Sequence, residues 1–194
     1  MEIFQIIKRN DVKSGKNGKI TILGGGLSGP VMAMYLSEKG YRVDIFERRP
    51  DMRKTNISAG RSINLAVSKR GITALEEIGV FHKISSKLIP MYGRIIHDID
   101  GSTRFLPYGR PDQYINSVSR SELNILLMTE AEKTDRIRIL FQHSCSGMDL
   151  ESGTVFITNE VNGDQVTIQG TPVIAADGSG SAVRESMIES GHIS

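Results

Sequence analysis

Residues 19–47 read KITILGGGLSGPVMAMYLSEKGYRVDIFE, and this stretch predicts the core of the fold. A short apolar run, 20–23, leads directly into the glycine-rich turn 24–29. A segment with helical apolar spacing follows, and a second strand-like run, 42–46, then reaches Glu47. Strand, glycine turn, helix, strand and acid, in this order, are typical of a dinucleotide-binding unit. An ordinary glycine-rich turn between a strand and a helix is the alternative.

Each conspicuous residue of this stretch has a physical role in such a unit. Gly24 permits the tight turn, Gly26 lets the backbone approach a pyrophosphate, and Gly29 lets helix and strand pack closely. The free N–H groups of a helix that starts near Leu27 would face the phosphates. Glu47 lies 18 residues after Gly29, where its carboxylate can accept hydrogen bonds from a ribose. An acid at this position disfavours a ligand with a 2′-phosphate.

Length and composition describe an ordinary soluble globular protein. The chain has 194 residues, which suits one domain or one domain with an appended lobe. Apolar residues make up 39% and charged residues 24%. The net charge of +2 gives no reason to expect a nucleic-acid or polyanion binder. No apolar run approaches the length of about 20 residues that spans a bilayer, and no signal peptide is visible.

Cysteine usage limits the chemistry further. Cys145 is the only cysteine, which excludes an intrachain disulfide framework and a cysteine-based metal cluster. A reducing compartment fits this usage, and with only four histidines we expect no metal site. We expect the polar, lysine-containing residues 1–18 to form a mobile arm ahead of the domain. Such a basic arm could also touch a membrane surface, but a solvated arm is the plainer interpretation.

The remainder of the chain mixes strand and helix patterns. We expect strands at 63–67, 114–118, 137–141, 154–158, 165–168 and 172–176, and a hairpin over 95–105 that turns at Asp100-Gly101. We expect three helices. The first spans 68–78 with Ser68 as its N-cap, the second follows a capping box formed by Ser119 and Glu122, and the third begins at about Ala182. The runs 154–158 and 165–168 are joined through Asn162-Gly163, which indicates a β-meander of the kind inserted as a crossover in nucleotide-binding folds.

The last strand pattern, 172–176, ends at Asp177-Gly178 and adds a second acid to the predicted site. A strand of this kind delivers its carboxylate to the carboxyl edge of the sheet, where a bound cofactor would lie. In flavin enzymes such an acid contacts the ribityl hydroxyls. The alternative is a helix N-cap, which Asp177 or Ser179 could supply without any ligand. Combined with the opening unit, the cofactor role is favoured.

Three arginine-bearing stretches lie between these motifs: GRSINLAVSKRG (60–71), PMYGRIIHDIDG (90–101) and QYINSVSRSELN (113–124). Here the chain resembles the kynurenine 3-monooxygenase family, flavoprotein aromatic hydroxylases of the p-hydroxybenzoate hydroxylase class. The motifs GRSINLA, PM-x-x-R-x-IHD, PYG and Q-Y-I-x-SVSR-x-x-LN all match, and the resemblance covers nearly everything from Lys19 to Met187. The implied fold is α/β: a Rossmann-like FAD/NAD(P)-binding domain of the glutathione-reductase type, with a β-meander crossover and part of a substrate-domain sheet.

The resemblance implies FAD as the cofactor and assigns residues to it. Ser28 matches a pyrophosphate contact, Glu47 and Arg49 match the adenosine end, Ala66 a position beside the flavin, and Arg120 an arginine on the cofactor. Cys145 matches an apolar adenine contact, so we expect it to pack rather than to do redox chemistry. The full set of expected cofactor-binding residues is Gly24, Gly26, Ser28, Gly29, Glu47, Arg49, Ala66, Arg120, Cys145 and Asp177.

The resemblance also implies a substrate and a reaction. Arg94 and Tyr108 match residues that hold the amino-acid carboxylate of L-kynurenine, a role that suits a guanidinium and a phenol. A solvated surface arginine and a tyrosine packed in a turn are the plain alternatives. The implied reaction is hydroxylation of L-kynurenine to 3-hydroxykynurenine with NADPH as co-substrate and O2. The aniline nitrogen of the substrate activates its own ring, so we name no catalytic side chain.

Enzymes of this class continue for a few hundred residues beyond the segment that matches here. We therefore expect 19–194 to be the FAD-binding domain with part of a substrate lobe, about 70–120, and to bind FAD weakly and without turnover by itself. A related flavin hydroxylase of another aromatic acid and a non-catalytic nucleotide-binding module remain open. So does a homodimer. We expect a cytoplasmic protein that associates with a membrane only through C-terminal segments absent from this chain.

Overall fold

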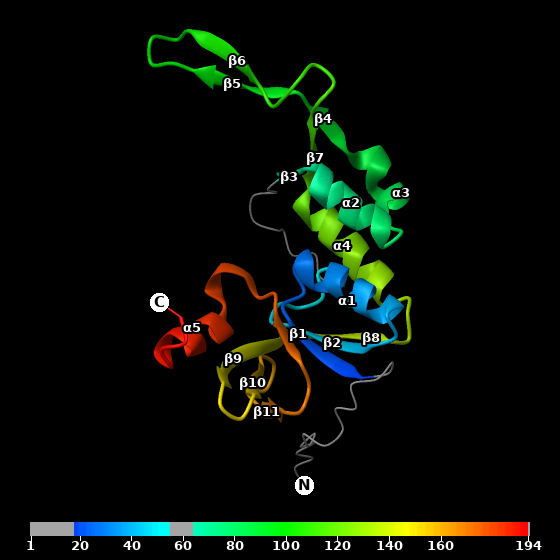
Figure 1. The fold of residues 1–194 in the computed structure, drawn as a ribbon, viewed down its shortest axis with the longest axis vertical. Helices are drawn as coiled ribbons and strands as arrows, with labels where there is room; N and C mark the ends of the chain where they lie inside the picture. Colours follow the sequence, from blue (N-terminus) through cyan, green and yellow to red (C-terminus); the bar gives the residue numbers. More distant parts are fainter. Residues whose placement is uncertain (1–17, 55–63, 194) are drawn as a thin grey trace. The chain divides into compact units, whose positions relative to one another are not determined.

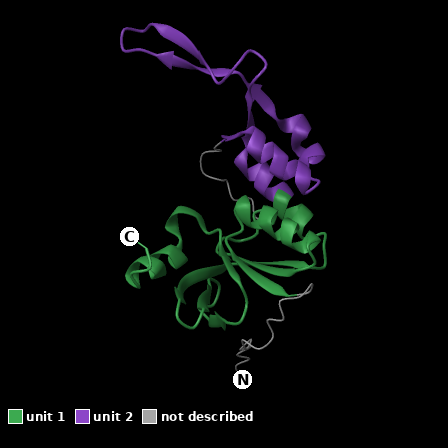
Figure 2. Cartoon of the chain, in the orientation of Figure 1, with its two compact units in different colours: residues 1–57, 127–194 green, residues 58–126 purple. Residues whose placement is uncertain are grey.

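The computed structural model of the chain describes residues 18–54 and 64–193. The chain forms two compact units, residues 1–57 with 127–194 and residues 58–126 (Figure 2). The predicted arm at 1–18 therefore lies outside the described part, except for Gly18. The carbonyl oxygen of Gly18 accepts a hydrogen bond from the Arg42 amide at 3.0 Å, so this residue already belongs to the sheet.

The first unit is built on a four-stranded parallel sheet. Its strands are β1 (Lys19–Leu23), β2 (Arg42–Glu47), β8 (Ile137–Phe141) and β12 (Val173–Ala175), in the order β12-β1-β2-β8. Helix α1 (Ser28–Glu38) packs on β1, β2 and β8 (Figure 1). Residues 20–23 and 43–46 of the central strands are buried on both faces, as in other parallel sheets, and all of them except Thr21 and Asp44 are apolar.

The strand order fixes where a ligand can bind. From β1 the chain runs through α1 to β2 on one side, whereas β12 pairs with β1 on the other side. The order of connection therefore reverses at β1. In open α/β sheets, ligands bind at the carboxyl ends of the strands at this point of reversal. The residues that follow β1 and β12 in the sequence therefore lie where a ligand is expected to bind.

A β-meander covers part of the core of this unit. Its strands are β9 (His143–Asp149), β10 (Thr154–Asn159) and β11 (Gln165–Ile168), and α5 (Ala182–Glu189) packs on β9. Strand β9 was not predicted, because its sequence HSCSGMD has no regular alternation of apolar and polar side chains. The meander joins the parallel sheet through one buried cluster of Leu23, Phe46, Val155, Ile157, Ile168 and Val183.

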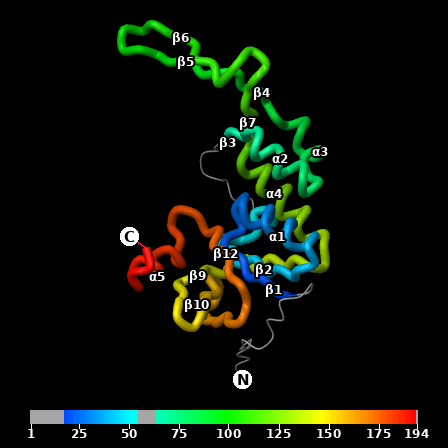
Figure 3. Tube along the Cα trace, in the orientation of Figure 1, coloured from blue at the N-terminus to red at the C-terminus, as the bar shows by residue number. Residues whose placement is uncertain are grey.

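The second unit contains a small antiparallel sheet in the order β3-β7-β4 and a separate hairpin, β5-β6. The elements, whose path can be followed in Figure 3, are β3 (Asn64–Val67), α2 (Lys69–Glu77), α3 (Phe81–Ile84), a 3-10 turn at Ser85–Lys87, β4 (Ile89–Met91), β5 (Gly93–His97), β6 (Thr103–Pro107) and β7 (Ile115–Ser119). Helix α4 (Arg120–Ala131) follows β7, and the division between the units falls within it. Elements α3 and β4 were not predicted.

The predicted two-residue turn of the hairpin is wrong. The last strand pair is His97 with Thr103, and the Asp98 amide donates to the Ser102 carbonyl oxygen at 3.0 Å. Three residues therefore form the loop, with Gly101 in the left-handed region at φ +84°. A two-residue Asp-Gly turn of type I′ also needs a positive φ at its first position, whereas a three-residue loop needs one glycine only.

Two predicted helix caps are only partly right. The Glu122 amide donates to Ser119 Oγ at 3.4 Å, which is one half of a capping box. The Glu122 carboxylate instead accepts from Lys87 Nζ at 3.2 Å, because α4 faces an available cation there. Ser68 occupies the N-cap position of α2 with extended backbone, but its side chain accepts no hydrogen bond from the helix.

The core cluster generates a first prediction. Ile157 is fully buried, whereas its neighbour on β10, Phe156, is 42% exposed. We expect Ile157→Ala to lower the free energy of unfolding by about 2–4 kcal/mol, because it removes buried methyl groups and leaves a cavity. Phe156→Ala, the matched control on the same strand, should cost less than half as much in urea denaturation. Equal losses for the two variants would contradict this assignment of the core.

Candidate cofactor site

The turn after β1 lies against the end of β12. Gly24 adopts φ +101°, and its amide donates to the Phe46 carbonyl oxygen at 2.8 Å. A Cβ on Gly24 would collide with the carbonyl group of Ala176 and the backbone of Asp177. A Cβ on Gly29 would in turn collide with the carbonyl oxygen of Gly24. The close approach of backbone to backbone therefore excludes any side chain at these two positions.

Gly26, the middle glycine, differs from the other two. A Cβ built on Gly26 would meet no atom within 4 Å, so the protein itself leaves the space beside this residue open. Helix α1 begins directly afterwards, with Leu27 at its N-cap, no side chain that caps it and no acidic residue in its first turn. Ser28 is exposed in that turn. This combination of open space and uncapped N–H groups suits an anion such as a pyrophosphate.

Glu47, at the carboxyl end of β2, is tied to the same turn. Its side chain is only 5% exposed, and Oε2 accepts from the Gly25 amide at 2.8 Å. Arg49 supplies the other donors: its amide and Nε donate to Oε1 at 2.8 Å each, and Nη2 donates to Oε2 at 3.1 Å. Burial alone would raise the pKa of Glu47, but the hydrogen bonds and the charge of Arg49 lower it below its ordinary value.

Gln142 holds the Arg49 backbone from the other side, a contact that sequence reasoning missed. Its amide donates to the Arg49 carbonyl oxygen at 3.1 Å, and its own carbonyl oxygen accepts from the Glu160 amide at 2.8 Å. Gln142 has φ +58°, which is uncommon for a residue other than glycine. A glycine or asparagine at this position would have indicated the left-handed turn, whereas glutamine gives no such signal.

Asp177, at the end of β12, carries a free acceptor. Its Oδ2 accepts from the Ala182 amide at 3.1 Å, while Oδ1 is buried and has no hydrogen-bond partner among the described residues. The N-cap alternative is therefore only partly right. Ser181 caps α5, since its Oγ accepts from the Arg184 amide at 3.2 Å. A buried carboxylate oxygen without a donor fits a ligand hydroxyl, because leaving it unpaired is costly.

Cys145 lies on β9 and is half-buried against the core cluster. Burial raises the pKa of its thiol, and the negative charge of Asp177 raises it further, against the lowering effect of a 3.5 Å bond to the Gly147 carbonyl oxygen. A thiol in this environment stays protonated and unreactive. Cys145 thus packs against the protein core, and its contact with adenine stays a prediction.

The remaining predicted residues belong to the second unit. Ala66 is an exposed residue of β3 paired with Ser117, and Arg120 is exposed at the start of α4. Arg94 on β5 pairs with Leu106, and the Tyr108 amide extends this ladder by donating to the Tyr92 carbonyl oxygen at 2.9 Å, so Arg94 and Tyr108 lie on one face of the hairpin. Within the described ranges, no protein group forms an ion pair with Arg94.

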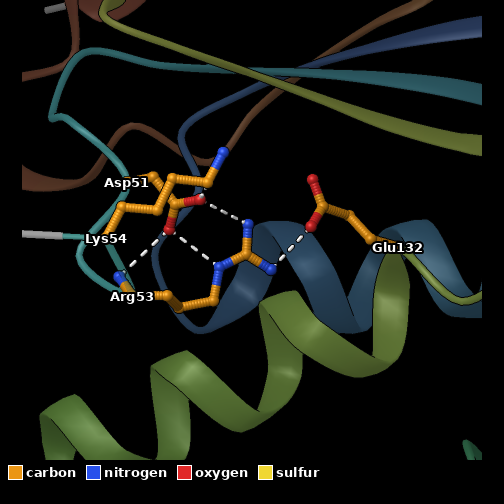
Figure 4. Close-up of polar contacts among 4 residues, drawn as sticks. All are labelled: Asp51, Arg53, Lys54 and Glu132. Carbon is orange, nitrogen blue, oxygen red and sulfur yellow. Dashed lines mark hydrogen bonds and ion pairs between the residues drawn. The ribbon is translucent and has the colours of Figure 1, made fainter.

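An ion-pair cluster fixes the loop that follows Arg49. The Arg53 guanidinium binds both carboxylate oxygens of Asp51 at 2.7 and 2.8 Å, and its Nη1 donates to Glu132 at 2.6 Å, just after α4 (Figure 4). The same guanidinium lies 5.4 Å from the ring centre of Phe141. The hydrogen bonds from Arg53 lower the pKa of the buried Asp51 carboxyl. From the sequence alone this segment was only a polar loop, with no sign that its charged side chains pair.

These features, an open glycine turn, an acid at the end of β2 and an unpaired acid at the end of β12, meet at one edge of the sheet. A family model described as FAD binding domain matches residues 18–191. The chain belongs to this FAD-binding domain family. The predicted α/β fold and FAD as the cofactor type are thereby confirmed.

Comparisons with individual proteins narrow the family further. This FAD-binding domain is 39% identical over 177 residues to kynurenine 3-monooxygenase of Myxococcus xanthus, covering 91% of this chain and 38% of that protein. It is 44% identical over 169 residues to kynurenine 3-monooxygenase of Cytophaga hutchinsonii, covering 86% of this chain and 37% of that protein. The predicted resemblance is thus confirmed, and the domain spans somewhat over a third of the length of these relatives.

Solved structures support the fold alone. The flavin-dependent monooxygenase PieE, crystallised with FAD and substrate, superposes with a TM-score of 0.71 at 19% identity, covering 88% of this domain and 32% of that chain. In residues 18–54 and 64–193, no helix of the domain is both long enough and apolar enough to span a membrane.

The lowered pKa of Glu47 generates a second prediction. A group with a depressed folded pKa stabilises the protein above its unfolded pKa, and this stabilisation is lost as the pH falls through the folded pKa. We expect Glu47→Gln to lower the free energy of unfolding by about 1–3 kcal/mol at pH 7. The difference from the wild type should begin to shrink as the pH falls below the ordinary glutamate pKa of about 4.3, and it should be smallest below the lowered folded pKa, where the wild-type carboxylate is protonated. Denaturation curves across this range test it, and a difference independent of pH would contradict it.

Proposed function

We propose that this chain is the FAD-binding part of an aromatic hydroxylase that converts L-kynurenine to 3-hydroxykynurenine with NADPH and O2. The observation that carries the cofactor proposal is the buried Asp177 Oδ1, which has no donor in the described protein and lies beside the Gly24 turn. The relatives named kynurenine 3-monooxygenase supply the support for the substrate.

The residues of the first unit divide among the parts of FAD by their chemistry. The open space at Gly26 and the start of α1 at Ser28 suit the pyrophosphate. Glu47 and Arg49 suit the adenosine ribose, Cys145 the apolar face of the adenine, and Asp177 a ribityl hydroxyl. Ala66 and Arg120, which belong to the second unit, stay predicted contacts.

The substrate would be held by its carboxylate. The Arg94 guanidinium can donate two parallel hydrogen bonds to a carboxylate, and the phenol of Tyr108 on the same face can donate a third. Both side chains are exposed, and neither has a hydrogen bond or ion pair with the described protein that it must break before it binds an anion.

Bound FAD would supply the redox chemistry between NADPH, O2 and the aromatic ring. The protein's own part is to seat the cofactor, to orient the amino acid through Arg94 and Tyr108, and to keep water away. The amino group on the aromatic ring of kynurenine activates the carbon that is hydroxylated, so the proposal assigns no general base. The 194-residue chain by itself we expect to bind FAD weakly and not to turn over.

The glycine turn gives a test of the cofactor site. Gly26→Ala should fold as the wild type does, within about 2 °C in melting temperature, because the new methyl group meets no protein atom. It should weaken FAD binding by about tenfold or more, because that methyl group fills the space assigned to the pyrophosphate. Flavin fluorescence titration measures the affinity.

Gly29→Ala is the matched comparison for this test. Its methyl group would collide with the Gly24 carbonyl oxygen, so it should lower both the melting temperature and the affinity for FAD. A Gly26→Ala protein that binds FAD as tightly as the wild type would contradict the proposed site.

The substrate proposal is tested at Arg94 in an enzyme that contains this chain. Arg94→Gln should raise the KM for kynurenine by about 10–100-fold, because a charge-assisted double hydrogen bond is lost, with FAD content unchanged. The control is Arg104→Gln, which removes another exposed arginine of the same hairpin. The measurement is kynurenine-stimulated oxidation of NADPH.

Three results would count against these assignments. Equal effects of the Arg94 and Arg104 variants would remove Arg94 from the substrate site. If another aromatic acid stimulates NADPH oxidation by the wild type and kynurenine does not, that acid and not kynurenine is the substrate. Kynurenine-stimulated turnover by the 194-residue chain alone would contradict the expectation that it is inactive.

A further inference from the structure

While Arg49 stays in place, the Glu47 carboxylate has no lone pair free to accept a further hydrogen bond. Oε1 accepts from the amide and Nε of Arg49, and Oε2 accepts from the Gly25 amide and Arg49 Nη2. A carboxylate offers about four lone-pair sites, and these donors use all of them. A ribose hydroxyl can therefore bind to Glu47 only after one of the present donors leaves.

The guanidinium is the donor that can leave without a change in the backbone. The Gly25 amide belongs to the buried glycine turn, and the Arg49 backbone is held on both sides, by Glu47 through its amide and by Gln142 through its carbonyl oxygen. The Arg49 side chain, in contrast, is 48% exposed and needs only rotations about its own bonds to swing away. Its departure would open one site on each oxygen of Glu47.

The cost of this exchange depends on the ligand. A bare nucleoside gives Glu47 two hydroxyl groups but gives the displaced cation no anion in return. A nucleotide with a diphosphate brings a new anion to the turn that contains Gly25 and Gly26, next to the position that the guanidinium leaves. A guanidinium binds phosphate oxygens as well as it binds a carboxylate.

We propose that Arg49 is a specificity residue: it caps Glu47 when the site is empty, excludes bare nucleosides from the ribose position, and exchanges the carboxylate for the diphosphate of an admitted nucleotide. The proposal rests on the proposed FAD site and adds a selection step to it. Arg49 thus acts against one class of ligand and in favour of another through the same side chain.

The test compares three ligands, adenosine, ADP and FAD, by calorimetry in the FAD-free form of an enzyme that contains this chain. We expect Arg49→Gln to raise the affinity for adenosine by about three- to tenfold and to lower the affinity for ADP and FAD by a similar factor. Arg48→Gln is the matched control, because it removes the same charge from the neighbouring exposed residue. It should leave the ratio of ADP to adenosine affinity unchanged.

A second measurement needs no variant. In ¹⁵N-labelled wild-type protein, saturation with ADP should move the resonance of the Arg49 Nε–H group, which leaves the carboxylate, while the Gly25 amide keeps its protection from solvent exchange. An Arg49 Nε–H resonance that stays in place in protein saturated with ADP overturns the exchange.

The outcomes separate this inference from the proposed function. If FAD and ADP bind but Arg49→Gln changes all three affinities in the same direction, or changes none, the selection role is wrong and the FAD site stands. The selection role is likewise wrong if the affinity for adenosine does not rise in Arg49→Gln. If neither FAD nor ADP binds to the wild type, the proposed function fails and this inference fails with it.

Discussion

The close approach of the glycine turn to the end of β12 is the constraint on which the site depends. Gly24 has its backbone against Ala176 and Asp177, and Gly29 has its backbone against Gly24, so two strands and a helix converge with no side chain between them. This convergence brings Asp177, which follows the last strand of the sheet, to the turn after the first. The β-meander and the second unit are inserted between these strands in the sequence, yet β12 pairs with β1 directly.

The sequence alone was sufficient for this part of the fold because its signals are local and periodic. The glycine spacing, the apolar runs of β1 and β2 and the Asp177-Gly178 ending each depend on backbone geometry that only certain residues permit. The same holds for β10 and β11, whose alternation and Asn-Gly connection were read correctly. Where local propensity and tertiary packing favour the same structure, prediction from sequence succeeds.

The failures share a different cause. Strand β9 has a polar sequence; it pairs with β10, the next strand of the chain, and α5, which is distant in the sequence, packs on it. The left-handed Gln142, which is held by Arg49 and Glu160, and the ion pair of Arg53 with Glu132 likewise depend on partners distant in the sequence. Long-range packing and charge pairing override local preference at these positions, so a single sequence carries no signal for them.

The two acids of the predicted site illustrate how much a structure adds to a motif. The sequence assigned Glu47 and Asp177 the same kind of role, acceptance of hydrogen bonds from cofactor hydroxyls. In the structure Glu47 has donors on both of its oxygens, whereas Asp177 keeps one buried oxygen without a donor among the described residues. A ligand therefore gains a hydrogen bond at Asp177 without breaking another, but at Glu47 it has to replace an existing donor. In the proposed site, Asp177 at the end of β12 would therefore add to the affinity for the cofactor, whereas Glu47 and Arg49 at the end of β2 would discriminate between ligands.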